Sequence, residues 1–149
     1  FIDLIPNYGK DGSWFVWNKR SSEAQQKGIG NVFELLWSKS KHKRLVFDFE
    51  WFGFLSKDDP KEARNRVHPS MKPSKLLSRL ITEYCKGNIL VDLFLGSGST
   101  MVASHQLKRK CFGMELDPKY CDVIVKRMIK LDDSLTIKRN GIDVTNEWK

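Results

Sequence analysis

Residues 89–100 read Ile-Leu-Val-Asp-Leu-Phe-Leu-Gly-Ser-Gly-Ser-Thr, and this stretch decides the fold. The apolar run that opens it is typical of a short parallel strand buried on both faces. The run breaks at Gly96 and Gly98, and Ser99 and Thr100 are residue types that start helices. A strand, a glycine turn and a helix together begin a nucleotide-binding βαβ unit. Its glycines let the backbone approach a ligand, and its helix N-terminus presents free N–H groups.

Two common nucleotide-binding loops are excluded by residues that they require. A dinucleotide fingerprint needs a third glycine where Met101 stands, and a P-loop needs a Gly-Lys-Ser/Thr sequence that does not follow here. Instead, Asp92 lies inside the strand, Phe94 follows it, and a second acid, Glu115, ends the next predicted strand at 110–116. An acid at that point accepts both hydroxyls of a ribose. Because the loop carries no cation for phosphates, a nucleoside ligand without a pyrophosphate fits better than NAD.

Three motifs in this order resemble those of the amino-group DNA methyltransferases, in their circularly permuted β class. Residues 92–100 are similar to the Asp-Pro-Phe-x-Gly-Ser-Gly-Thr-Thr loop that binds S-adenosylmethionine in that family. Residues 68–73, His-Pro-Ser-Met-Lys-Pro, resemble the His-Pro-Thr-x-Lys-Pro box that precedes the loop. Residues 112–117, Phe-Gly-Met-Glu-Leu-Asp, followed by Tyr120, resemble the ribose-binding strand end and its helix. The resemblance covers nearly the whole chain, more loosely before residue 67.

The resemblance implies a fold and a cofactor site. The fold is a Rossmann-like α/β methyltransferase sheet, mostly parallel with an antiparallel hairpin strand, with helices on both faces, and incomplete at its N-terminus. The cofactor is S-adenosyl-L-methionine, with Asp92 facing its ammonium group and Lys72 its carboxylate. Leu93 replaces the family's usual proline, and no metal ligands are expected. The residues expected to bind the cofactor belong to the box, the loop and the two acids: Ser70, Lys72, Asp92, Phe94, Gly96, Ser97, Gly98, Ser99, Thr100 and Glu115.

The composition favours one globular domain with a polyanionic partner. The chain has 149 residues, of which 40% are apolar, and a net charge of +8. We expect a single domain with target-side strands at 1–67, a cofactor half at 68–131 and a polar tail at 132–149. The three cysteines form no C-x-x-C pair and no signal peptide precedes them, which indicates a reducing cytosol. The resemblance implies a cytoplasmic protein that is bacterial, archaeal or phage-encoded. No run is long enough to span a membrane. The resemblance implies that the partner is double-stranded DNA.

The remaining elements follow from local patterns. Aromatic and branched residues predict strands at 13–19, 31–38 and 45–56, with a bulge at Gly53. The last two strands are joined by a short turn, which predicts an antiparallel hairpin. Helices are predicted at 23–27, 73–86 and 99–107 and from Pro118 onward, and a weak strand at 135–138. Residues 57–67 are charged and aperiodic, which predicts a loop.

The turn between the second and third predicted strands is strongly basic. Its four cationic residues are the candidate DNA contacts: Lys39, Lys41, Lys43 and Arg44. If the strand at 31–38 is a parallel member of the sheet, its C-terminal end lies on the same edge as the glycine loop, where ligands of open α/β sheets bind. The basic turn would then contact DNA phosphates beside the site. The alternative is an ordinary solvated hairpin tip.

One expected part of the family pattern is absent from the sequence. The family holds its target amine with an Asp/Asn/Ser-Pro-Pro-aromatic tetrapeptide, whose polar groups orient the amine and whose ring stacks on a flipped base. No such tetrapeptide occurs here, so no catalytic residue is assigned. In the β-class order it would precede Phe1. The chain starts with Phe rather than Met and enters an apolar stretch directly, so we expect a fragment, a processed product or a trimmed chain. We expect the strand leading into it between residues 89–95 and 13–19, supplied by an N-terminal segment or a partner chain; a homodimer is also open.

The sequence therefore predicts the cofactor-binding part of a site-specific DNA methyltransferase of the restriction-modification type, acting on adenine N6 and inactive alone. Cytosine N4 is the first alternative, because the absent tetrapeptide decides between the two. A non-catalytic cofactor- or DNA-binding remnant acting through a partner is the second. An RNA or small-molecule methyltransferase is the third. Because the family's target-recognition segment has only residues 57–67 available, sequence specificity is expected to be low or supplied from elsewhere.

Overall fold

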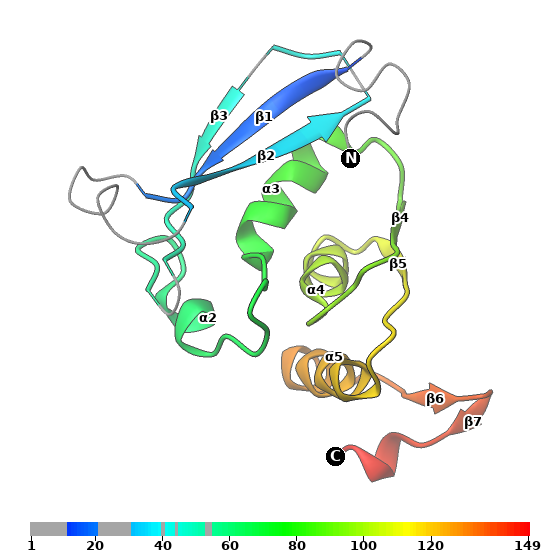
Figure 1. Ribbon diagram of the computed structural model, residues 1–149. Helices are drawn as coiled ribbons and strands as arrows, with labels where there is room; N and C mark the ends of the chain where they lie inside the picture. The colour runs from blue at the N-terminus through cyan, green and yellow to red at the C-terminus, as the bar shows by residue number, and fades with distance from the viewer. Residues whose placement is uncertain (1–11, 21–30, 40, 44, 53–54) are drawn as a thin grey trace. The chain divides into compact units, whose positions relative to one another are not determined.

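The computed structural model describes residues 12–20, 31–39, 41–43, 45–52 and 55–149 (Figure 1). The chain divides into two compact units, Phe1–Asn65 and Arg66–Lys149, and each is described by itself below. This boundary lies two residues before the expected start of the cofactor half at His68. The predicted helix at 23–27 and the predicted bulge at Gly53 lie outside the described residues.

The first unit is built on a three-stranded sheet with β1 in its centre. The strands β1 (Ser13–Asn18), β2 (Phe33–Ser38) and β3 (Leu45–Asp48) have the order β2-β1-β3. β2 pairs antiparallel with β1, and β3 pairs parallel with it. Side chains of β1 alternate between buried and half-buried, as a strand with one core face requires. Phe15 lies 5.4 Å, centroid to centroid, from Phe47.

The predicted hairpin between β2 and β3 is wrong, because β1 lies between these two strands. The connection passes the amino end of β1, where the Ser13 hydroxyl donates to the His42 carbonyl and accepts from the His42 N–H, each at 2.8 Å. The His42 ring stacks on Phe15 at 4.0 Å. A short connection therefore made β2 and β3 run in opposite directions without making them neighbours. The expectation that a further strand pairs with β1 is also wrong, because β2 and β3 occupy both of its edges.

The end of the first unit also differs from the prediction. β3 stops at Asp48 rather than at residue 56, although the Trp51 N–H still donates to the Lys19 carbonyl at 3.1 Å. The predicted loop at 57–67 contains a short helix, α2 (Pro60–Arg64). The Asp59 side chain caps this helix by accepting from the Glu62 N–H at 3.1 Å. The Asp-Pro start signal therefore decided the structure where a five-residue helix is too short to show periodicity.

The second unit follows the predicted order of helices and parallel strands. Its elements are α3 (Ser74–Tyr84), β4 (Ile89–Asp92), α4 (Ser99–Gln106), β5 (Lys110–Gly113), α5 (Pro118–Leu131), β6 (Lys138–Arg139), β7 (Ile142–Asp143) and the 3-10 helix η2 (Thr145–Glu147). β4 and β5 pair in parallel, and β6 and β7 form a hairpin. Its turn has positive φ at Asn140 (53°) and Gly141 (83°), as the primed two-residue turns require.

Local start signals place the helices of the second unit. Pro73 precedes α3, and Asp117 caps α5 by accepting from the Lys119 N–H at 2.9 Å, which confirms the predicted Asp-Pro start. The carboxyl end of α3 is closed by a residue distant in sequence. Arg109 Nη1 donates to the carbonyls of Ile81 at 3.3 Å, Cys85 at 2.6 Å and Gly87 at 3.2 Å. Carbonyls at a helix end have no partner within the helix, so Arg109 anchors α3 to the start of β5.

The core of this unit lies between α4, α5 and the loop after β4. It contains Leu95, Val102, Ile124 and Met128, with Met101 and Leu135 packed against it. The opposite face of the strand pair is open. Val91 and its register partner Phe112 are 66% and 59% exposed, so β4 is not buried on both faces by the described residues.

We expect the Ser13 hydroxyl to stabilise the crossing over β1. Ser13→Ala removes both hydrogen bonds to the His42 backbone and should lower the free energy of unfolding of the first unit by about 1 kcal/mol. Ser13→Thr keeps a hydroxyl and should stay close to the wild type. Urea unfolding followed by tryptophan fluorescence measures this, because Trp14, Trp17, Trp37 and Trp51 all lie in the first unit. Equal stability of the alanine variant would contradict the expectation.

Candidate functional site

The glycine loop between β4 and α4 has a backbone that requires two glycines. Gly96 has φ of 55° and Gly98 has φ of 80°, both in the left-handed region. A Cβ on Gly98 would also lie 3.0 Å from Ile124 Cγ1. Gly98 is the N-cap of α4 and supplies no side-chain cap. The first N–H groups of α4 therefore have no side-chain partner from the cap position.

The loop forms one wall of a cavity of about 390 Å³ within the second unit. The lining residues come from the box, α3, the end of β4, the loop and the first turn of α4: His68, Ser70, Met71, Lys72, Leu77, Asp92, Phe94, Leu95, Gly96, Ser97, Ser99 and Thr100. The structure thus brings eight of the ten predicted cofactor residues to one cavity; Gly98 and Glu115 are not among its lining. A cavity of this size with apolar walls and a few polar groups is typical of a small-molecule site.

Glu115 contacts the glycine loop directly, although it does not line the cavity. Its Oε2 accepts from the Gly96 N–H at 2.6 Å, and its Oε1 accepts from the Asp117 N–H at 2.9 Å. The N–H of Asp117, first, then those of Gly96 and Leu116 and the nearby His68 lower the pKa of Glu115, against an opposing effect of desolvation. Glu115 is therefore an anion at neutral pH that holds the loop. The predicted contact with a ribose stays a prediction.

Asp92 and Phe94 lie where β4 ends, just before the glycines of the loop. Asp92 is half-buried at the end of β4, and its Oδ1 accepts from the Phe94 N–H at 3.0 Å. This local bond fixes the carboxylate among the residues that line the cavity. The Phe94 side chain is 90% exposed although it lines the same cavity. The site thus offers one carboxylate and one open aromatic face.

The His68 box is a turn against α5. His68 Nδ1 accepts from the Ser70 N–H at 2.9 Å, and the His68 carbonyl accepts from the Met71 N–H at 3.1 Å. The His68 ring packs on Tyr120 with centroids 4.3 Å apart. Because Nδ1 accepts this hydrogen bond from Ser70, the neutral His68 ring carries its proton on Nε2. The turn places Lys72, half-buried, in the cavity wall immediately before α3.

Arg127 on α5 contacts the glycine loop, and the sequence did not reveal this contact. Its Nη1 donates to the Ser97 carbonyl at 2.6 Å, the Ser97 hydroxyl at 3.1 Å and the Ser99 hydroxyl at 3.4 Å. The one signal in the sequence was a charged residue at helical spacing with Ile124 and Met128, which are buried. An arginine on that face of a helix has to find acceptors inside the protein.

The candidate DNA contacts lie in the other unit. Lys39, Lys41 and Lys43 are exposed, and Arg44 lies outside the described residues. The lysines were expected near the glycine loop on the condition that the strand at 31–38 is parallel. This condition is not met, because β2 runs antiparallel to β1. Its C-terminal end therefore lies at the amino end of β1 and not at the carboxyl end, where ligands of such sheets bind. DNA contact by these lysines stays a prediction that rests on charge alone.

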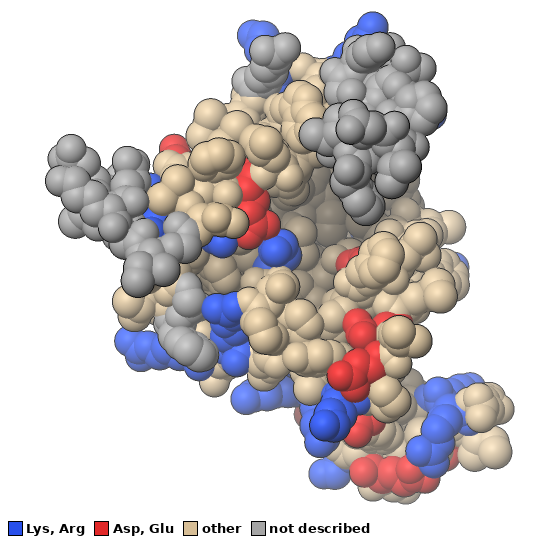
Figure 2. Space-filling model, viewed as in Figure 1, with Lys and Arg blue, Asp and Glu red and all other residues tan. Residues whose placement is uncertain are grey.

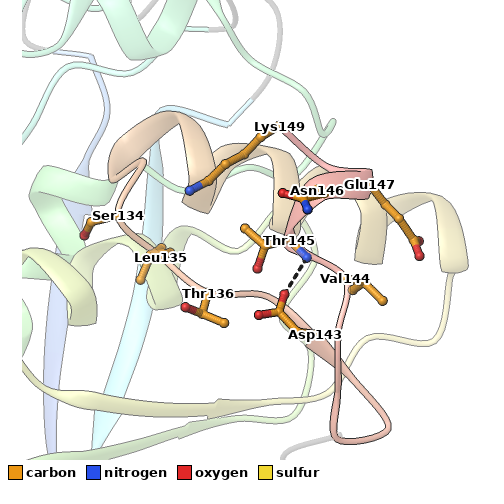
Figure 3. Close-up of a pocket in the computed structure, with 9 residues that line it drawn as sticks. All are labelled: Ser134, Leu135, Thr136, Asp143, Val144, Thr145, Asn146, Glu147 and Lys149. Carbon is orange, nitrogen blue, oxygen red and sulfur yellow. Dashed lines mark hydrogen bonds between the residues drawn. The ribbon is translucent and has the colours of Figure 1, made fainter.

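A second cavity, of about 540 Å³, lies in the tail (Figure 3). It is formed by residues 134–136, 143–147 and 149, with the Asp143 carboxylate accepting from the Thr145 N–H at 2.9 Å. The hydroxyl and N–H of Thr145 lower the pKa of Asp143. None of the predicted cofactor residues lines this hollow. Its lining consists of tail residues alone, and the Asp143–Thr145 hydrogen bond joins two of them.

Neither a metal site nor a membrane-spanning helix is found in the described part of the chain. There, no group of three or more His, Cys, Asp or Glu side chains has the arrangement of a metal site. Among the same residues, no helix has both the length and the apolar character needed to cross a bilayer.

Two curated relatives are type II methyltransferases. M2.LlaDCHI of Lactococcus lactis subsp. cremoris is 37% identical over 81 residues, which are 54% of this chain and 29% of the relative. M2.DpnII of Streptococcus pneumoniae is 37% identical over 79 residues, 52% of this chain and 29% of the relative. The matches thus span less than a third of each relative's length.

Solved structures show the same fold. M1.HpyAVI in complex with SAM superposes with a TM-score of 0.53 at 25% identity, over 80% of this chain and 61% of that chain. The cytosine-N4-specific PvuII DNA methyltransferase superposes with a TM-score of 0.52 at 16% identity, over 91% of this chain and 53% of that chain. The second match shows the fold alone. Both support the expected Rossmann-like methyltransferase class.

A family model described as DNA methylase matches residues 6–126, which is most of the chain. The match covers most of both predicted halves, including the glycine loop and Glu115. Together with the cavity geometry, it makes the chain a member of the N6/N4 amino-group DNA methylase family.

Proposed function

We propose that this chain is the S-adenosylmethionine-binding part of a DNA methyltransferase that modifies the N6 amino group of adenine. The observation that carries the proposal is the cavity of about 390 Å³, which gathers the loop, Asp92 and the box in one unit. The likeness to M1.HpyAVI, whose solved structure is a complex with SAM, supports the cofactor in this proposal. The proposal places the chain in the cytoplasm of a bacterium, an archaeon or a phage-infected cell, where DNA is available.

The side chains of the cavity fit the cofactor's functional groups. The Asp92 carboxylate suits an ammonium group, while Lys72 and the Ser70 hydroxyl suit a carboxylate. The uncapped first turn of α4 favours the same carboxylate. Glu115 uses two of its acceptor positions on backbone N–H groups and retains others for ribose hydroxyls. The cofactor would supply an electrophilic methyl group on its sulfonium. The residues of this chain would bind and orient it and exclude water.

The alternatives differ in what they need beyond this cavity. Cytosine N4 is the first alternative, and digestion of modified DNA to nucleosides distinguishes the two products. A non-catalytic remnant would bind the cofactor or DNA and act through a partner. An RNA or small-molecule methyltransferase is disfavoured by the DNA methylase family match.

The strand pair of the second unit supports the need for a further segment. Among the described residues, β4 pairs only with β5. Val91 and Phe112 are exposed on one face of this pair, whereas the faces of parallel sheets are normally covered by other elements. The sequence also contains no Asp-Pro-Pro-Tyr-type tetrapeptide. We therefore propose that an additional strand, with the amine-binding residues after it, pairs with β4. An N-terminal segment, a partner chain or a second copy of this chain would supply it.

Double-stranded DNA is the proposed substrate, and basic residues of the first unit are the proposed phosphate contacts. The net charge of +8 supports a polyanionic partner. Lys39, Lys41 and Lys43 project from a connection whose backbone is held on Ser13. Figure 2 shows that Lys and Arg side chains also gather over α2, where Lys61 and Arg64 are exposed.

Cofactor binding should depend on Glu115. Glu115→Ala removes the acceptor proposed for the ribose hydroxyls and should weaken the affinity for S-adenosylmethionine by about tenfold or more. Asp122→Ala, an exposed acid on α5, serves as the control and should bind like the wild type. Isothermal calorimetry on the purified chain measures both. If the wild type binds and Glu115→Ala binds equally well, Glu115 is not part of the site.

DNA binding should depend on the three exposed lysines of the crossing segment. Changing Lys39, Lys41 and Lys43 to Gln should weaken binding to all DNA sequences alike and flatten the salt dependence, by about 0.9 in the logarithmic slope for each phosphate that is no longer neutralised. A matched triple variant at Lys126, Lys130 and Lys138, all exposed in the second unit, controls for net charge. Fluorescence anisotropy with labelled duplexes at several salt concentrations gives the slopes. Equal slopes in the two variants would reduce the effect to net charge.

Methyl transfer should require the additional segment. The chain alone should incorporate no labelled methyl group into DNA, because its sequence contains no tetrapeptide for holding the target amine. A polypeptide that carries the strand and an Asp-Pro-Pro-Tyr-type tetrapeptide, added in trans, should restore incorporation. The same mixture with Glu115→Ala is the control for dependence on this chain's cavity. Robust methyl transfer to DNA by the chain alone would contradict the proposal.

A further inference from the structure

We infer that Arg127 is a positioning residue that fixes the conformation of the cofactor loop from behind. The inference rests on the proposed function in one respect, namely that the loop binds S-adenosylmethionine. Arg127 lies on α5, 30 residues after Ser97 in the chain, and does not line the cavity. Any effect it has on a ligand must therefore pass through the loop.

The loop contains polar groups that cannot be left without partners. Ser97 and Ser99 are 3% and 6% exposed. Buried hydroxyls and carbonyls without a hydrogen bond destabilise a protein. Arg127 Nη1 lies within 2.6 Å of the Ser97 carbonyl and within 3.1 and 3.4 Å of the Ser97 and Ser99 hydroxyls. One guanidinium nitrogen thus contacts three oxygens of the loop.

The peptide between Ser97 and Gly98 is held at both of its ends. Its carbonyl accepts from Arg127, and its N–H donates to the Leu95 carbonyl at 2.8 Å. With glycines on both sides of Ser97, the backbone has access to other conformations, because glycine tolerates positive and negative φ about equally. The two hydrogen bonds select one of these conformations.

A second charge acts on the start of the loop. The Glu115 carboxylate accepts from the Gly96 N–H at 2.6 Å. An anion that follows β5 therefore takes the N–H of Gly96, and a cation on α5 takes the carbonyl of the next residue, Ser97. Charge-assisted hydrogen bonds are stronger than neutral ones. The loop is set by two opposite charges from outside it, in addition to its glycines.

The contacts of Arg127 determine which polar atoms of the loop remain available to a ligand. Arg127 engages the Ser97 carbonyl and both serine hydroxyls, which are acceptors of this segment. The first N–H groups of α4, without a side-chain cap, remain as donors. With Arg127 in place the loop recognises an acceptor group such as a carboxylate. Without it, the Ser97 carbonyl can turn and disturb that donor surface.

The test compares Arg127→Met, which keeps the length of the side chain without its donors, with Arg127→Lys, which keeps the charge but has no planar fork. Lys126→Met, at the exposed neighbouring position on α5, is the matched control. The first measurement is hydrogen exchange of the Gly98 amide in cofactor-free protein, by NMR. The second is the affinity for S-adenosylmethionine, by calorimetry.

Arg127→Met should speed Gly98 exchange about tenfold and weaken affinity about tenfold, since each reports loss of a hydrogen-bonded peptide. Arg127→Lys should lie between it and the wild type, and Lys126→Met should match the wild type. Unchanged exchange and affinity in Arg127→Met would overturn the inference. If Arg127→Met does not fold, Arg127→Lys decides, and wild-type exchange and affinity in that variant would overturn it too. If the wild type itself does not bind, the proposed function fails, and the Gly98 exchange rates alone decide the role of Arg127.

Discussion

The close approach of Gly98 to Ile124 is the constraint on which the second unit depends. A Cβ at this position would lie 3.0 Å from Ile124 Cγ1, and the φ of 80° is one that other residues rarely adopt. The contact lets α4 begin directly on α5, with Leu95, Val102 and Met128 packed around it. The chain thereby leaves β4, turns sharply and presents the first turn of α4 to the cavity. The core and the candidate site are consequences of the same contact.

Two hydrogen bonds to charged side chains fix the loop conformation that the two glycines allow. Glu115 and Arg127 hold two peptides of the loop through an anion and a cation. The pKa of Glu115 is lowered by the N–H donors of Asp117 and then Gly96. A lowered folded-state pKa means that this stabilisation is present above the usual glutamate pKa and is lost as the pH falls through the lowered value. The loop therefore keeps both charged contacts at neutral pH.

The first unit is organised by a different rule, the central place of β1. Both edges of β1 are paired, and the connection from β2 to β3 crosses its amino end on the Ser13 hydroxyl. This arrangement moves the basic connection to the end of the sheet opposite to the one where α/β proteins bind ligands. In the second unit, by contrast, β4 has one paired edge among the described residues. Of these two strands, β4 is the one with an edge that the described residues leave unpaired.

Local sequence alone determined the glycine loop and the starts of α3 and α5, because these follow from short motifs such as Asp117-Pro118. Most residues that line the cavity were expected from the resemblance of three motifs to a known family. Local sequence was silent or wrong about several contacts whose partners lie far apart in the chain. Adjacency of β1 and β3 depends on pairs of residues distant in sequence, such as Phe15 with Leu45, and a short turn specifies strand direction only. Arg127 stands at helical spacing with Ile124 and Met128, but nothing in the sequence indicated its hydrogen-bond partner. Only the tertiary structure brought it to Ser97, because a buried carbonyl finds its donor through packing and not through sequence spacing.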